Sequence, residues 1–279
     1  MEPLLAKCSG VILSGAKDLK KEEKIMAQGF DQQNQYYSQD QYQNNMGYDP
    51  TAAEGSVLGQ VNTLMHQEVI AKSFLYMVAA LVVTAVAAFA APNALAKILI
   101  ANPMAIYGLI IAELAIVIVS NIAIKKNNAI LTAILFTVYS FLTGATLGII
   151  FWAYDLGSVG AVFLMTAGMF GATAIYGLVC KKDLSSIGGI LVMGIIGIII
   201  ASVVNMIFLH SEGIDLIISY IGVAVFVGLT AYDTQKIKKA VAYATPDRMA
   251  TIALSGAFEL YLDFINIFLR LLRIMGRRK

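Results

Sequence analysis

Four carboxylic acids lie inside apolar stretches of this 279-residue sequence, and they are the side chains best placed to do chemistry. Glu113 sits in the middle of one stretch, and Asp233 lies near the end of another. Glu259 and Asp263 are four residues apart, so a helix would place them on one face. Acidic groups at membrane depth are costly and commonly belong to ion paths or proton relays. We therefore expect these four residues to form the functional site.

Asp233 and Asp263 are predicted to act as a pair. Their stretches are adjacent in the sequence, which predicts two antiparallel helices packed side by side. Two carboxyls in a low-dielectric site cannot both ionise cheaply, so they tend to share one proton. Such a pair is a proton-sensitive clamp, or a cation site when both groups are ionised. No firm metal site is predicted, and we expect calcium, which prefers oxygen ligands, as a permeating ion.

The composition predicts the elements that must position these acids. The chain is 58% hydrophobic and 14% charged, whereas soluble domains are about 25% charged. The apolar residues form runs of roughly 20 residues, the length that spans a bilayer. We expect an all-α polytopic membrane protein with seven transmembrane helices. The seventh is too polar to face lipid, so it should lie at the centre, wrapped by the other six. The predicted spans are Val69–Ala91, Pro103–Ile124, Ala129–Ala153, Ser158–Cys180, Ile187–Leu209, Ile214–Ile237 and Met249–Ile274.

Smaller features refine this architecture. Gly144 and Gly148, four residues apart, predict a close approach between two helices. Lys72 and Arg270, near span ends, are expected to extend their charges to the membrane surface. The net charge of +2 gives no argument for nucleic acid as a partner. Two cysteines are too few for a disulfide framework or a metal cluster.

The N-terminal segment differs in composition from the rest. Between Gln28 and Tyr48, 14 of 21 residues are Gln, Asn or Tyr, which predicts disorder because no core can form. We therefore divide the chain into a disordered tail, 1–56, and a membrane domain, 57–279. The apolar spacing from Val57 to Met65 predicts a short amphipathic helix at the membrane surface or a simple helical linker. Purine-rich codons expected for Lys21–Lys24 suggest that Met26 is the native start and that 1–25 are leader.

Lysines in the connections predict the orientation, because cytoplasmic loops are enriched in Lys and Arg. The second, fourth and sixth connections carry them, whereas the third and fifth are acidic. The N-terminus is therefore expected in the cytoplasm. Arg277, Arg278 and Lys279 disagree, so the last helix either crosses with its charges outside or enters and returns. We favour crossing.

Several motifs resemble the Bax inhibitor-1 family over roughly residues 60–279. The most specific is Gly256-Ala-Phe-Glu-Leu-Tyr-Leu-Asp-Phe-Ile-Asn-Ile-Phe268, followed by Leu-Arg-Leu-Leu-Arg-Ile. Weaker matches are Ala231-Tyr-Asp-Thr-Gln-Lys-Ile-Lys238, Lys181-Lys-Asp-Leu-Ser185 and Ala112-Glu-Leu-Ala115. The resemblance implies seven helices around a central last one, in a bacterial inner membrane.

The same resemblance implies a function. Family members are described as pH-sensitive calcium-leak channels with an aspartyl pair between helices six and seven, which matches Asp233 and Asp263. The family's second-helix glutamate matches Glu113. The family's basic residue near the end of that helix is matched only loosely, by Lys125 one position later. Glu259 occupies a position that is often uncharged in relatives, and it adds a third carboxyl.

Two other function classes share features with this sequence. An intramembrane aspartyl protease would also use two aspartates, but no Gly-x-Gly precedes Asp263 and no Pro-Ala-Leu occurs. A regulator that binds a membrane protease or a stress-pathway protein remains the main alternative. The sequence has no nucleotide-binding glycine motif, and we expect neither enzymatic activity nor a resident cofactor. The expected partners are the lipid bilayer, calcium and, for a regulator, a membrane protein.

Overall fold

The computed structural model describes residues 57–90 and 105–279 of the chain. The predictions for the tail 1–56 and for a start at Met26 lie outside the described residues. Seven of the described helices are long and apolar enough to cross a membrane. The helices are α4 Val57–Ala90, α6 Ala105–Lys125, α7 Ala129–Ala153, α8 Leu156–Val179, α9 Ser185–Val204, η1 Asn205–Leu209, α10 Glu212–Ala242, η2 Pro246–Arg248 and α11 Met249–Met275.

The first span begins earlier than hydropathy alone predicts. The segment from Val57 to Met65 is the start of α4 and runs without a break into the membrane-spanning part. The predicted helix over this segment is present, and it is continuous with the first span. Lys72 lies on this helix and pairs with Glu68 one turn earlier at 2.7 Å. This ion pair keeps the lysine charge at the exposed face of α4.

Three helices begin where a polar side chain caps them. The side-chain oxygens of Asn128, Asp155 and Ser211 each accept a hydrogen bond from the backbone N–H three residues later. Such caps satisfy a donor that the first helical turn leaves unpaired. This explains why α8 starts at Leu156 and not at the predicted Ser158.

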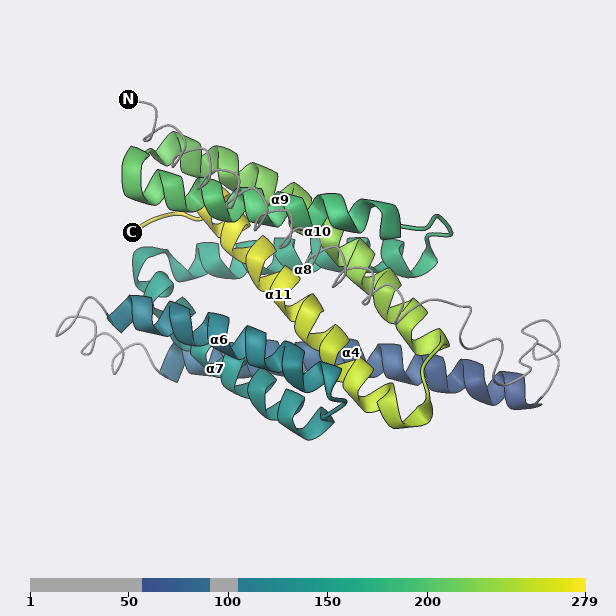
Figure 1. Cartoon of the computed structure of the whole chain (residues 1–279). Coiled ribbons are helices and arrows are strands. Elements are labelled where there is room, and N and C mark those ends of the chain that lie inside the picture. Colours follow the sequence, from purple (N-terminus) through teal and green to yellow (C-terminus); the bar gives the residue numbers. More distant parts are fainter. Residues whose placement is uncertain (1–56, 91–104) are drawn as a thin grey trace, which may run out of the picture. The chain divides into compact units, whose positions relative to one another are not determined.

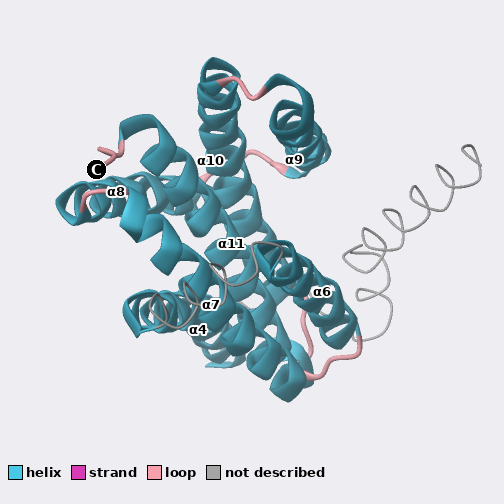
Figure 2. Cartoon of the chain, turned by 90° about the vertical axis from the view of Figure 1, so that its left-hand side faces the viewer, coloured by secondary structure: helices cyan, strands magenta, loops and turns pink. Residues whose placement is uncertain are grey.

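Helix α11 lies at the centre of the described helices (Figures 1 and 2), as the polar character of its sequence predicts. It contacts α4, α6, α7, α8 and α10, while α9 packs mainly on α10. In its most apolar part 61% of the residues are buried, against 11% for α6 and α9. Aromatic rings of α7 and α8, including Phe136 and Phe163, pack edge-on against those of α11.

Glycines allow α4 and α7 to approach closely, as their spacing predicts. A Cβ atom added to Gly144 would lie 2.4 Å from the carbonyl oxygen of Thr84, and one added to Gly148 would lie 2.6 Å from that of Ala88. Both neighbours are backbone atoms that cannot move aside easily. At the same contact, Thr84 and Tyr261 share a hydrogen bond of 2.6 Å, which ties α4 to the central helix.

The last helix crosses the whole bundle and does not return. Beyond α11, the N–H of Asp155 donates to the carbonyl of Arg277 at 2.9 Å, and Lys279 N–H donates to Ala153 at 3.0 Å. The C-terminus thus lies beside the α7–α8 connection. At the other end, Asn127 hydrogen-bonds Asp247 across the α6–α7 and α10–α11 connections. We call these the C-terminal end and the lysine-rich end.

Candidate functional site

Three of the four predicted acids come together on the facing sides of α10 and α11. Asp233 lies on α10, and Glu259 and Asp263 lie one turn apart on α11. Asp263 is within electrostatic range of both other carboxyls. We call these three residues the carboxyl cluster. The antiparallel packing of adjacent spans and the four-residue spacing on α11 together account for their meeting.

Glu259 is neutralised by a neighbour on α10. Its carboxylate accepts a hydrogen bond from the ammonium of Lys236 at 2.8 Å, and the two side chains are 34% and 23% exposed. Lys236 lies three residues after Asp233, so the same helical face carries an acid and its nearest base. The cluster therefore holds three carboxyls beside this one ammonium.

Asp263 is the most enclosed of the three acids. Its side chain is 4% exposed, and Oδ2 has no hydrogen-bond partner among the described residues. The hydroxyl of Thr230 on α10 lies beside it. Thr230 donates to the carbonyl of Phe226 at 2.9 Å, one turn earlier on its own helix. A buried oxygen without a donor is costly, so a shared proton or a cation would stabilise this position.

Glu113 belongs to a different environment. It lies on α6, half-buried, and accepts a hydrogen bond from Thr146 of α7 at 2.9 Å. Tyr139, also on α7, is within electrostatic range of it. Glu113 is thus placed at the α6–α7 contact, whereas the carboxyl cluster lies between α10 and α11.

Gln235 is a site-adjacent residue that the sequence analysis missed. It is 6% exposed and binds the segment that connects α8 to α9. Its amide donates to the carbonyl of Lys182 at 2.8 Å, and its oxygen accepts from the N–H of Leu184 at 2.8 Å. Nearby, Lys239 donates to the carboxylate of Asp183. These contacts fix the Lys181–Ser185 motif against α10, close to the cluster.

The arrangement favours proton sharing and transient cation contact. Within the described part of the chain, no group of three His, Cys, Asp or Glu has the geometry of a metal site. The cluster offers oxygen atoms along the α10–α11 contact, which is the chemistry that a permeating hard cation requires.

Comparisons with known proteins bear on this site. A family model described as inhibitor of apoptosis-promoting Bax1 matches residues 66–279. Inner membrane protein YbhL of Escherichia coli (strain K12) is 46% identical over 218 residues, which cover 76% of this chain and 93% of YbhL. An uncharacterized protein of Borreliella burgdorferi is 40% identical over 223 residues, covering 77% and 94% of the two chains. One of Deinococcus radiodurans is 38% identical over 223 residues, covering 79% and 93%.

Proposed function

Because this chain belongs to the Bax inhibitor-1 family of integral membrane proteins, we propose that it is a pH-sensitive calcium leak channel gated by Asp233 and Asp263. The observation that carries the proposal is the buried Asp263 carboxyl, whose Oδ2 has no hydrogen-bond partner among the described residues. It lies within range of Asp233 on the neighbouring helix. We further propose a bacterial inner membrane as its location, with the N-terminus in the cytoplasm.

The gate works through the charge on the pair. With one proton between them, the two carboxyls hydrogen-bond and hold α10 against α11. With both ionised, they repel each other and attract a divalent cation. The leak therefore rises as the pH increases and the pair loses its shared proton. Lys236 and Glu259 set the local electrostatic field in which this proton is held.

Glu113 has a separate role in this proposal. It lines the ion path at the α6–α7 contact and attracts cations, but it does not take part in the shared proton. Its hydrogen bond from Thr146 fixes one carboxylate oxygen and leaves the other available to an ion. Glu113→Gln should therefore lower the flux at each pH and leave the pH midpoint unchanged.

Calcium entry into liposomes at several pH values tests the proposal. The full-length protein is reconstituted with an internal calcium dye, and the flux is measured for wild type, Asp233→Asn and Asp263→Asn. A single carboxyl has no partner for a shared proton, so both variants should lose the pH dependence. Asp155→Asn, an acid in the α7–α8 connection, is the matched control and should behave as wild type.

The same measurement can contradict the proposal. An unchanged pH dependence in both aspartate variants, with intact helical content, would disprove the gate. The absence of calcium flux in the wild-type protein at every pH would disprove the channel itself and favour a regulatory role.

A further inference from the structure

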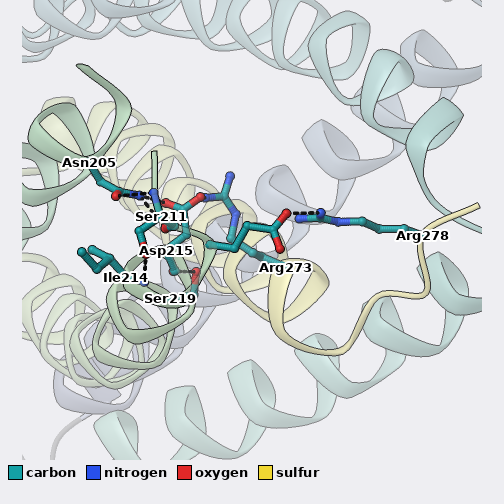
Figure 3. Close-up of polar contacts among 8 residues, drawn as sticks. Asn205, Ser211, Ile214, Asp215, Ser219, Arg273 and Arg278 are labelled. Carbon is teal, nitrogen blue, oxygen red and sulfur yellow. Dashed lines mark hydrogen bonds and ion pairs between the residues drawn. The ribbon is translucent and has the colours of Figure 1, made fainter. Parts of the chain in front are cut away.

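A polar cavity of about 640 Å³ lies at the C-terminal end of the bundle, away from the carboxyl cluster. Its walls come mainly from η1, α10 and α11, and Figure 3 shows polar side chains that gather there. The polar residues that line it include Asn205, Glu212, Asp215, Asn266, Arg270 and Arg273. We call it the arginine cavity.

One wall of the arginine cavity is held in a fixed, irregular shape. Asn205 is 3% exposed, and its amide nitrogen donates to the Ser211 carbonyl and to Asp215, each at 3.0 Å. The five residues of η1 form a π-helix that ends at His210, whose φ of 47° is left-handed. At membrane depth, irregular backbone is tolerated where it lines a cavity or is buried in protein. π-Helical turns are also frequent at functional sites.

The cavity lining carries two carboxylates and two guanidinium groups, but they do not pair one to one. Asp215 pairs with Arg273 at 2.7 Å, and Glu212 pairs with Arg278 at 3.2 Å (Figure 3). Arg270 also faces the cavity, yet it makes no ion pair with any residue that the structure describes. Both carboxylates are thus paired, Glu212 with an arginine outside the lining, and Arg270 has only the carboxylate of Asp215 within electrostatic range among the described residues.

The side chain of Arg270 packs against α10 at Gly222. A Cβ atom at Gly222 would lie 3.1 Å from Nε and 3.2 Å from Cδ of Arg270. Glycine at this position leaves room for the arginine stem, which packs along α10. The stem of Arg270 is thus half-buried against α10, and its charged end borders the cavity. A charge at this depth requires a partner of opposite sign.

We propose that Arg270 and Arg273 bind the phosphate group of an anionic ligand in the arginine cavity. The two residues are three apart on α11 and share one face. A guanidinium group matches phosphate with two parallel hydrogen bonds, which a halide cannot accept. Arg270 lies five residues before the end of α11 at Met275, about 8 Å along the helix. That depth suits the phosphate of a lipid headgroup as well as a free phosphate.

Binding to the purified full-length protein in detergent tests this site with two probes. Inorganic phosphate is added, and the unfolding midpoint is compared with that in chloride at equal ionic strength. Phosphatidylglycerol is added to delipidated protein, and bound lipid is counted by native mass spectrometry against diacylglycerol with the same acyl chains. We expect at least one phosphate-bearing probe to bind.

Variants connect the binding to Arg270. Arg270→Gln should weaken it about tenfold or more, because a charge-assisted hydrogen-bond pair is lost. Arg270→Lys should retain part of the affinity. Arg277→Gln is the matched control, since Arg277 is exposed at the same end of the bundle and outside the cavity. Gly222→Ala crowds the Arg270 stem and should also weaken binding, which keeps the test usable if Arg270→Gln does not fold.

Each outcome bears on the proposal. Binding of phosphatidylglycerol alone identifies a lipid headgroup as the ligand, and binding of inorganic phosphate alone identifies a soluble anion. Binding of neither probe by the wild-type protein overturns the proposal. Equal binding by wild type and a folded Arg270→Gln overturns it as well.

Discussion

The carboxyl cluster and the arginine cavity use the same two helices but leave groups of opposite charge without an ion pair. In the cluster, three carboxyls of α10 and α11 share the ammonium of Lys236. At the cavity, Glu212 and Asp215 pair with Arg278 and Arg273, and Arg270 is left without an ion pair among the described residues. At both places a charged residue of α11 pairs with the opposite charge on α10: Glu259 with Lys236, and Arg273 with Asp215. The pairs hold the helices together, and the group left over determines which ion each place can bind.

The two places also differ in enclosure. Asp263 lies in the packed centre of the bundle and is 4% exposed, whereas Arg270 borders an open cavity. A proton can reach and leave a tightly packed carboxyl, but a phosphate group needs the room that the cavity gives. Enclosure and charge therefore point to a small cationic species at the cluster and a larger anion at the cavity.

The largest expected effect concerns which side of the membrane each region faces. In a background without Cys8 and Cys180, cysteines at Asp155 and Lys279 should both react with an impermeant thiol reagent in intact cells. Cysteines at Asn127 and Asp183 should be protected, because they lie at the lysine-rich end. Permeabilised cells, in which all four should react, provide the control.

Two results would contradict this assignment. Protection of Lys279→Cys with labelling of Asp155→Cys would conflict with the backbone hydrogen bonds between the C-terminus and the α7–α8 connection. Labelling at Asn127 would reverse the orientation of the whole bundle.

A glycine beside each region distinguishes rigid from adaptable packing. At Gly177 a Cβ atom would lie 2.4 Å from the backbone oxygen of Ala231, close to the carboxyl cluster. At Gly222 the three atoms nearest to it all belong to the flexible Arg270 side chain. Gly177→Ala should therefore lower the free energy of unfolding by about 1–3 kcal/mol, as overpacking does, and Gly222→Ala by less. Thermal unfolding in detergent measures both.

Gly168→Ala provides the control for that comparison. It lies on the same helix as Gly177, and nothing lies within 4 Å of its added Cβ. It should be neutral or slightly stabilising, since alanine favours a helix over glycine. If Gly168→Ala lowered the free energy of unfolding as much as Gly177→Ala, close packing against α10 would not be the cause.

A smaller effect is expected from the charges that surround the aspartyl pair. Lys236→Met removes the positive charge that favours ionised carboxyls, so the midpoint of the calcium leak should move to higher pH. Glu259→Gln removes a negative charge and should move the midpoint to lower pH. Each shift should be about one pH unit or less, because the ion pair is partly exposed.

Lys72→Met is the matched control for these variants. Lys72 pairs with Glu68 on α4 and should not affect the midpoint. Shifts in the same direction for Lys236→Met and Glu259→Gln would contradict an electrostatic influence on the gate.

Much of the fold follows from apolar stretches, because a bilayer demands helices of a fixed minimum length. The central place of α11 was also predictable, since its charges cannot face lipid. Helix ends were less predictable. Helix α10 continues to Ala242, five residues beyond the predicted Ile237, because hydropathy detects the apolar window and not the polar turns that extend it.

Contacts between helices were harder to predict than the helices themselves. The spacing of Glu259 and Asp263 gave their shared face, but the partner of Glu259 depends on how α10 is rotated. The hydrogen bond from Thr146 to Glu113 likewise depends on packing between separate segments. So does the contact of Arg270 with Gly222, which lies far from it in sequence. Local spacing carries no signal for such pairs.

The smallest effect is expected at the surface ion pair nearest the cluster. The hydrogen bond from the Lys239 ammonium holds the pKa of Asp183 at about 2, below its ordinary value of 3.8. Because the folded value is the lower one, the contact stabilises the fold above pH 3.8 and is lost as the pH falls toward 2. The Asp183 side chain is 64% exposed, so the stabilisation is well under about 1 kcal/mol. Between about pH 5 and pH 8, where carboxylates stay ionised, Asp183→Asn should therefore leave the thermal unfolding midpoint almost unchanged. The pH midpoint of the leak should also stay almost unchanged. Thermal unfolding and liposome flux measure these two quantities. A leak midpoint that moved as far in Asp183→Asn as in Glu259→Gln would place part of the gate in the α8–α9 connection and break the distinction between the enclosed cluster and the exposed surface.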